Sequence, residues 1–369
     1  MMRRAALVAS VGVMLLVGAC SPGDPGVPEP EEVGASEGGT TRDPIEMTPI
    51  TVTMGGACIC HAPLYVGIEK GFFADRGLEI SYRQLTGGFT AMGSLQTGDA
   101  DVADAAVAAA AAASGQGIEA QAVVVGNGDA SGTVDTSEYF AIVAREGSGI
   151  IADDLDSLRG KTIGAAEGTI AHQYLYDTLR AAGIDSTSDL TVQSVQAPDL
   201  VSALQSGSVD AIVGWEPGPL QALASVEGSY IVVRGGGAMQ YLFARWFAPD
   251  FLESNPDAAR AFVEGFVEAM QYARANPDET ADIVAKEFTS LDRAIIVEAL
   301  GYLNFDPRVS QFTLEAAAQA VSFAQNSAGL ATDFEFRDHL EFALLESVLA
   351  DHPEWLADLP EIPASKRLE

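Results

Sequence analysis

The chain has 369 residues and carries 52 acidic against 20 basic side chains, a formal net charge of −32. Binding of nucleic acid or docking on an anionic membrane surface needs a basic surface, so this balance argues against both functions. Hydrophobic residues make up 48% and charged residues 20%, as in ordinary globular proteins, and the length allows about two domains. The high surface charge leads us to expect a monomer.

The N-terminus is similar to the signal sequence of an exported bacterial lipoprotein. Arg3 and Arg4 precede the apolar stretch 5–17, which has the length of a signal-peptide core and is too short to span a bilayer. Small residues then lead into Cys20, as in a lipobox. The resemblance implies that residues 1–19 are a signal peptide and that Cys20 carries lipid. An ordinary signal peptide with an incidental cysteine is the alternative.

Residues 20–48, which would follow the cleavage site, are rich in Pro, Gly, Ser and Glu. This composition cannot bury a core and indicates a flexible tether. We therefore expect an extracytoplasmic protein, anchored by lipid to the outer face of a bacterial membrane at the cell surface or in the periplasm. The remaining sequence contains no apolar run of about 18 residues, so we expect no other membrane anchor.

Segments typical of strands alternate with segments typical of helices over two parts of the chain. The first part has expected strands at 50–53, 78–82, 101–103 and 120–125, and expected helices at 63–68, 91–96 and 105–113. The second part has expected strands at 161–164, 190–192, 211–213 and 230–233, and expected helices at 169–182 and 198–205. The alternation is typical of βαβ units around a largely parallel sheet.

One short pattern occurs in both parts. The sequence LQTGDADV at 95–102 is echoed by LQSGSVDA at 204–211. Each copy combines a helix end, a glycine, an aspartate and the start of a strand. Two related α/β lobes explain this echo better than chance does.

After Tyr241 the sequence becomes mostly helical, with Asn255 and Pro256 starting a helix whose apolar residues share one face. This arrangement suggests a chain that crosses between lobes at 138–144 and 235–244. We expect lobe 1 to comprise 49–140 and 237–369, including the C-terminal helices, and lobe 2 to comprise 141–236.

Six motifs, in order, resemble those of the solute-binding proteins of ABC importers for nitrate, sulfonates, taurine and thiamine-pyrimidine precursors. They lie at 65–80, 97–101, 158–164, 167–172, 209–217 and 276–279. The resemblance covers about residues 49–350. It implies an α/β fold of the two-lobed periplasmic-binding-protein type (type II), with two crossing strands and a solute in the interlobe cleft. It also implies delivery of the solute to an ABC permease and its ATPase, with no chemistry and no cofactor.

Ligands of open α/β sheets bind beyond the carboxyl ends of strands, against helix N-termini. This rule selects as the ligand site the loops 55–61, 86–90, 104–106 and 127–131 of lobe 1 and the loops 166–171 and 214–217 of lobe 2. The crossing strands add 138–139 and 240–243. The predicted ligand-binding residues are Cys58, Cys60, His61, Gly88, Phe89, Asp104, Asn127, Tyr139, Glu167, Thr169, Trp215, Glu216 and Tyr241. Simpler roles remain open: Trp215 can pack the lobes together, and Glu216 can cap the helix that Pro217 begins.

The charge of these loops predicts the charge of the solute. They hold no lysine or arginine, and their charged residues are Asp104, Asp129, Glu138, Glu167 and Glu216. Free carboxylates would repel a sulfonate or nitrate, whereas they accept hydrogen bonds from N–H donors. We therefore predict a neutral or cationic nitrogen heterocycle, pyrimidine-like, with an anion as the alternative.

Cys58 and Cys60, followed by His61, form a C-x-C-H cluster. In an extended segment the side chains two apart are about 6.5–7 Å from each other, so we expect free thiols rather than a disulfide. The cluster could supply three ligands to a soft metal, but the sequence offers no fourth ligand. We therefore predict small pocket-lining residues and no metal.

Two other classes of function remain. The same superfamily includes a pyrimidine-forming enzyme with a Cys/His-rich segment, which Cys58, Cys60 and His61 resemble. The signal sequence argues against that enzyme, because its chemistry would lack cytosolic cofactors. An extracytoplasmic sensor is the third class, but no signalling domain follows.

Overall fold

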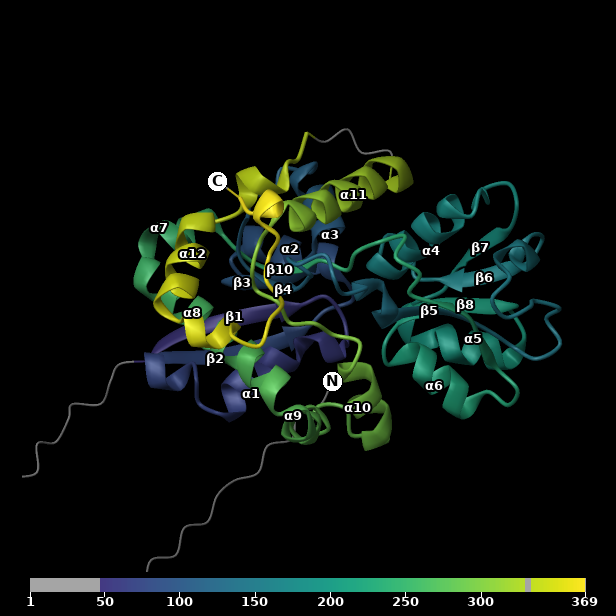
Figure 1. Ribbon diagram of the computed structural model, residues 1–369, viewed down its shortest axis with the longest axis horizontal. Coiled ribbons are helices and arrows are strands. Elements are labelled where there is room, and N and C mark those ends of the chain that lie inside the picture. Colours follow the sequence, from purple (N-terminus) through teal and green to yellow (C-terminus); the bar gives the residue numbers. More distant parts are fainter. Residues whose placement is uncertain (1–46, 329–332, 369) are drawn as a thin grey trace, which may run out of the picture. The chain divides into compact units, whose positions relative to one another are not determined.

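The computed structural model describes residues 47–328 and 333–368, which form two five-stranded sheets with helices packed around each (Figure 1). The predicted signal peptide, the predicted lipidation site Cys20 and almost all of the predicted tether lie outside the described residues. Among the described residues, no helix has both the length and the apolar character needed to cross a membrane.

The first sheet has the strand order β2-β1-β3-β10-β4. Its strands are β1 (Thr48–Met54), β2 (Leu78–Gln84), β3 (Val102–Ala106), β4 (Gln121–Asn127) and β10 (Phe243–Phe247). β1 pairs in parallel with β2 and β3, whereas β10 runs antiparallel to both of its neighbours, β3 and β4.

The second sheet has the order β7-β6-β8-β5-β9. Four of its positions hold the strand numbered five higher than in the first sheet, and β5 takes the place that β10 has there. Its strands are β5 (Phe140–Ala144), β6 (Thr162–Ala165), β7 (Thr191–Ser194), β8 (Ala211–Trp215) and β9 (Tyr230–Arg234). Here β5 is the antiparallel strand, between β8 and β9. Each sheet therefore contains one antiparallel strand that directly follows a strand of the other sheet in the chain. β5 follows β4 of the first sheet, and β10 follows β9 of the second.

The helices lie mostly between the strands of each sheet and in the C-terminal third. They are α1 (Ala62–Glu69), α2 (Gly88–Thr97), α3 (Val107–Ser114), α4 (Ile170–Ala181), α5 (Leu200–Ser206), α6 (Gly218–Ser225), α7 (Pro249–Ser254), α8 (Pro256–Ala275), α9 (Pro277–Val284), α10 (Arg293–Leu300), α11 (Gln311–Ala328) and α12 (Phe342–Asp351). The predicted apolar face of α8, which includes Phe262 and Phe266, is fully buried. A Cβ atom at Gly67 of α1 or Gly265 of α8 would collide with Phe73, so both glycines make room for that ring.

The repeated sequence pattern has the same local structure in both sheets. Gly98 ends α2 with φ 73° and Gly207 ends α5 with φ 72°, the left-handed conformation that glycine adopts without strain. Three residues later, Asp101 Oδ2 accepts a hydrogen bond from the Thr51 N–H at 2.8 Å. Asp210 Oδ2 accepts the equivalent bond from the Thr162 N–H at 3.1 Å. The pattern therefore marks two copies of one α/β junction.

Two sequence predictions about secondary structure need correction. The expected helix 105–113 begins only at Val107, because Ala105 and Ala106 extend β3 and pair with β10. The region after Tyr241 does not turn directly to helix, because Phe243–Phe247 forms β10 in the middle of the first sheet. In both places backbone pairing within a buried sheet overrides local propensity.

Candidate functional site

A pocket of about 70 Å³ lies where the carboxyl ends of strands from both sheets meet. The first sheet contributes the loops after β1, β2 and β3, and the second contributes the loop after β6 and the end of β8. Its lining residues are Gly55, Cys58, Cys60, His61, Thr86, Gly87, Gly88, Asp104, Ala105, Ala106, Ala108, Ala109, Gly168, Thr169, Ile170, Trp215, Tyr241 and Phe243. This is the kind of position that the strand-end rule predicts.

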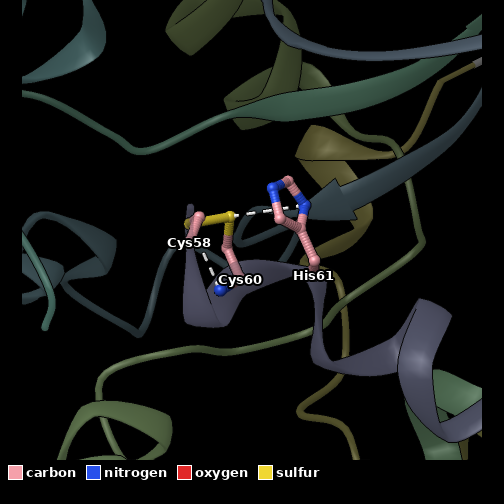
Figure 2. Close-up of side chains that lie close together, drawn as sticks. All are labelled: Cys58, Cys60 and His61. Carbon is pink, nitrogen blue, oxygen red and sulfur yellow. Dashed lines mark hydrogen bonds between the residues drawn. A yellow bond between two sulfur atoms is a disulfide. The ribbon is translucent and has the colours of Figure 1, made fainter. Parts of the chain in front are cut away.

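The prediction of free thiols is wrong, because Cys58 and Cys60 form a disulfide (Figure 2). The segment is not extended throughout: Cys58 is, but a short 3-10 helix, η1 (Ile59–His61), starts immediately after it. The turn brings the two Cα atoms to 5.1 Å, within the range that a disulfide spans. Cys58 Sγ also accepts a hydrogen bond from the Cys60 N–H at 3.2 Å.

His61 is buried at the pocket wall and contacts polar atoms with both ring nitrogens. Nδ1 lies 2.8 Å from Asp104 Oδ2, and Nε2 lies 3.1 Å from the carbonyl oxygen of Gly56. Cys60 Sγ lies 3.9 Å from Nδ1 (Figure 2). The imidazole is therefore held in one orientation between the β1 loop and the end of β3.

Asp104 is not the free carboxylate that the sequence suggested. Its side chain forms an ion pair with Arg245, which is fully buried in β10 directly opposite Asp104 in the antiparallel register. Sequence reasoning missed Arg245 because the residue lies in a strand rather than in a predicted pocket loop. The pair compensates the negative charge of Asp104 within the lobe.

The other predicted carboxylates do not line the pocket. Glu216 is buried and pairs with Arg234 at 2.5 Å, and its Oε2 accepts the Leu220 N–H at 3.1 Å, as a helix-capping carboxylate does. Burial raises the pKa of Glu216, against the opposing effect of Arg234. Asp129 accepts the backbone N–H groups of Ser131 and Val134, so it stabilises its own loop.

Glu138 and Glu167 complete the predicted set of five, and both are exposed to solvent. Within the described part of the chain, Asp104 is thus the one carboxylate that lines the pocket, and no lysine or arginine lines it. The assumption of a ring of free carboxylates was therefore wrong, and the ligand charge that it predicted loses its basis.

Three helices begin at the pocket. α2 contributes Gly88, α3 contributes Ala108 and Ala109 from its first turn, and α4 contributes Thr169 and Ile170. None of the three has a side-chain cap bond among the described residues. The first N–H groups of a helix lack intrahelical acceptors and form the positive end of its dipole. This part of the wall therefore favours an anionic group.

Aromatic side chains form a second part of the wall. Trp215, Tyr241 and Phe243 line the pocket. The indole N–H of Trp215 donates to the carbonyl oxygen of Ala57 at 3.3 Å, so this residue both faces the pocket and bridges the two sheets. Tyr241 stacks on Tyr139 at a centroid distance of 5.4 Å.

The structure thus brings eight of the thirteen predicted residues to one pocket. They are Cys58, Cys60, His61, Gly88, Asp104, Thr169, Trp215 and Tyr241. The other five do not line it, and they are Phe89, Asn127, Tyr139, Glu167 and Glu216. Phe89 faces solvent, while Asn127 is buried and its Oδ1 accepts the Asn304 N–H at 2.9 Å.

Ala108 and Ala109 line the pocket outside every predicted loop. They were missed because the helix was expected to begin at Ala105, two residues too early, which placed both alanines inside it rather than at its first turn. Extending the expected strand to Ala106 would have placed the start of the helix at Val107, and with it both alanines in the first turn.

The sequence model of the family described as NMT1/THI5-like matches residues 59–280, more than half of the chain. The chain therefore belongs to this family. A Bacillus subtilis (strain 168) protein whose provisional name is aliphatic sulfonates-binding protein is 24% identical to this chain over 301 residues. The match covers 79% of this chain and 86% of that protein. The riboflavin-binding protein RibY of Chloroflexus aurantiacus (strain ATCC 29366 / DSM 635 / J-10-fl) is 24% identical over 321 residues, covering 82% and 85%.

The periplasmic aliphatic sulphonate binding protein SsuA from Escherichia coli has the same fold. Its crystal structure matches with a TM-score of 0.68 at 19% identity, covering 81% of this chain and 99% of that one. The prediction of a two-lobed α/β fold of the periplasmic-binding-protein type is confirmed.

Proposed function

We propose that this protein is the extracytoplasmic solute-binding component of an ABC importer, and that it binds a small organic anion between its two lobes. The observation that carries the proposal concerns the described residues: three helix N-termini without a side-chain cap meet at a pocket, and the one carboxylate that lines this pocket is already paired. Backbone N–H groups can then hold an anionic head group without a lysine or arginine.

The size of the pocket supports a small solute. Its volume of about 70 Å³ is far below the roughly 300–1,000 Å³ of sites that hold drug-sized ligands. Trp215, Tyr241 and Phe243 would cover the apolar part of the solute, while the helix N-termini would bind its charged end. Closure of the lobes would exclude water, and both lobes would then present a surface to the permease.

The anchor is part of the same proposal. A charged N-terminus, a short apolar core and Cys20 support export and lipidation, and the Pro- and Gly-rich segment 20–48 supports a tether. A binding protein held in this way would deliver solute to a permease and ATPase in the same membrane.

A neutral or cationic nitrogen heterocycle is the second candidate. The three aromatic residues that line the pocket favour it, because a planar ring stacks on aromatic side chains. A relative named for riboflavin agrees with a ring-containing solute. The enzyme alternative has less support, because it relies on thiols that this structure joins in a disulfide.

The test is a thermal-shift panel with the purified protein, followed by calorimetry of each stabilising compound. Taurine, alkyl sulfonates and nitrate form one arm, and pyrimidines, flavins and amines form the other. We expect stabilisation by taurine or an alkyl sulfonate, without turnover, and stabilisation by nitrate alone would reject an organic solute. Stabilisation by the second arm alone would reject an anionic solute but would leave the assignment as a solute-binding protein intact. Chemical conversion of a bound compound would reject that assignment.

A further inference from the structure

Donor atoms that suit a zinc ion meet at one point on the pocket wall. The sulfur atoms of Cys58 and Cys60 and a ring nitrogen of His61 all lie within 4.8 Å of one another (Figure 2). The sequence offered no fourth ligand, but the fold brings Asp104 Oδ2 to 2.8 Å from His61 Nδ1. Two sulfurs, one imidazole nitrogen and one carboxylate oxygen are a donor set that Zn²⁺ accepts.

The orientation of His61 suits metal binding. In the metal-free protein Nδ1 donates to Asp104 Oδ2, because a carboxylate only accepts hydrogen bonds. Binding of an ion at Nδ1 would require the tautomer with the proton on Nε2, which would then donate to the Gly56 carbonyl oxygen 3.1 Å away. A ligand histidine whose other nitrogen donates to a backbone carbonyl is the usual arrangement at zinc sites. The Gly56 carbonyl would therefore fix both the tautomer and the ring position.

The distance between Cys60 Sγ and His61 Nδ1 is close to that between two ligands of a tetrahedral site. With Zn–S near 2.3 Å and Zn–N near 2.0–2.1 Å, adjacent sulfur and nitrogen ligands lie about 3.5 Å apart. Cys60 Sγ and His61 Nδ1 are 3.9 Å apart. In the disulfide the two sulfurs are bonded to each other and cannot both bind a metal, so the site requires their reduction.

We propose that reduction of the Cys58–Cys60 disulfide creates a site for Zn²⁺, or a similar divalent ion, on the wall of the solute pocket. A dithiol supplies two electrons and two protons, the S–S bond breaks, two cysteine thiols form and the dithiol becomes a disulfide. The ion then binds as both thiols lose their protons to solvent. The pocket supplies the entry path, because Cys58, Cys60, His61 and Asp104 all line it.

The balance of charges around the site supports a divalent cation. Two thiolates and Asp104 carry three negative charges, and the divalent ion together with Arg245 carries three positive ones. This site goes beyond the proposed transport function and does not depend on it.

The experiment uses the full chain with Cys20→Ser, so that Cys58 and Cys60 are the remaining cysteines. One sample is kept oxidised, and one is reduced with a phosphine, which takes oxygen from water, and is then desalted without air. Both are titrated with Co²⁺, whose thiolate charge-transfer absorption reports sulfur ligation, and then with Zn²⁺. The variant Cys58→Ser with Cys60→Ser removes the site, and His339→Gln is a histidine control distant in sequence.

We expect one Co²⁺ per reduced chain with thiolate absorption, displacement by Zn²⁺, and no such absorption in the oxidised chain. The double cysteine variant should lose the signal, and His339→Gln should keep it. Absence of binding to the reduced chain, or equal binding to the oxidised chain, would overturn the site. The oxidised and reduced samples share one sequence, so this comparison stands even where a variant folds poorly.

Discussion

Arg245 of β10 lies directly opposite Asp104 of β3, and the two side chains form an ion pair that is almost completely excluded from water. The guanidinium also lies over the rings of Phe243 and Phe266, 5.1 and 4.5 Å from their centroids. Burial lowers the pKa of Arg245, and Asp104 opposes that effect. The charge of Asp104 is therefore compensated within the first sheet.

The first prediction concerns this pair. Asp104→Asn should lower the free energy of unfolding by about 3–5 kcal/mol, because it leaves a buried arginine without a counter-charge. Asp104→Asn combined with Arg245→Met should recover a large part of the loss, since the unpaired charge is then gone. Urea denaturation of the three variants measures both effects. A double variant as unstable as the single one would show that the pair is not the cause.

The second prediction concerns Trp215. Trp215→Ala should weaken solute binding by about 1–3 kcal/mol, because a ring that covers the solute is lost. Trp215→Phe should retain part of the affinity, since it keeps an aromatic face and loses only the bond to Ala57. Calorimetry with the best solute from the panel measures both. Phe89→Ala is the control, because Phe89 is exposed and does not line the pocket. Unchanged affinity in Trp215→Ala would assign this residue to lobe packing.

The third prediction concerns pH. His172 Nδ1 accepts the Gly168 N–H at 3.3 Å, and the ring packs edge-on against Phe323 of α11 at 5.4 Å. Burial lowers its pKa below the ordinary 6.5, against the opposing effect of Glu167. The unfolded chain therefore binds a proton here more readily than the folded chain does.

It follows that the free energy of unfolding should decrease as the pH falls below about 6.5 towards the folded-state pKa of His172. Above about pH 6.5 the contribution of His172 to this free energy should be retained in full. His172→Gln should reduce this dependence. Melting temperatures of both proteins across that range test the prediction, and identical pH profiles would contradict it.

The fourth prediction concerns the repeated aspartates. Asp101→Ala and Asp210→Ala should each lower the free energy of unfolding by about 1.5–3 kcal/mol, because each loses a backbone hydrogen bond to a charged acceptor. Asp210 also pairs with Arg145, so its variant should be the less stable of the two. Asp99→Ala, in the same loop as Asp101, is the matched control and should have a smaller effect. Denaturant unfolding measures all three, and equal losses would reject the role of the repeat.

The fifth prediction concerns Cys20. Cys20→Ala should release the protein from membranes without changing its melting temperature, because the predicted anchor and tether precede the folded lobes. Fractionation of cells that produce the parent protein and the variant measures the release. Retention of Cys20→Ala in the membrane fraction would argue against the lipobox.

The sequence by itself determined the two-lobed α/β fold and several of the loops that line the pocket. Strand and helix periodicity, glycine caps and the repeated Gly and Asp positions are local features, so they can be read in order along the chain. The strand-end rule then selects loops, and this is why Cys58, His61, Asp104 and Trp215 were expected at one pocket.

Only the tertiary structure decided the electrostatics of that pocket. Arg245 follows Asp104 by well over a hundred residues, and its pairing depends on the register of β10 between β3 and β4. The Cys58–Cys60 bond depends on where η1 begins. Charge compensation and covalent pairing are set by distances of a few ångströms, and those distances arise only when strands and turns that are remote or irregular in sequence pack together.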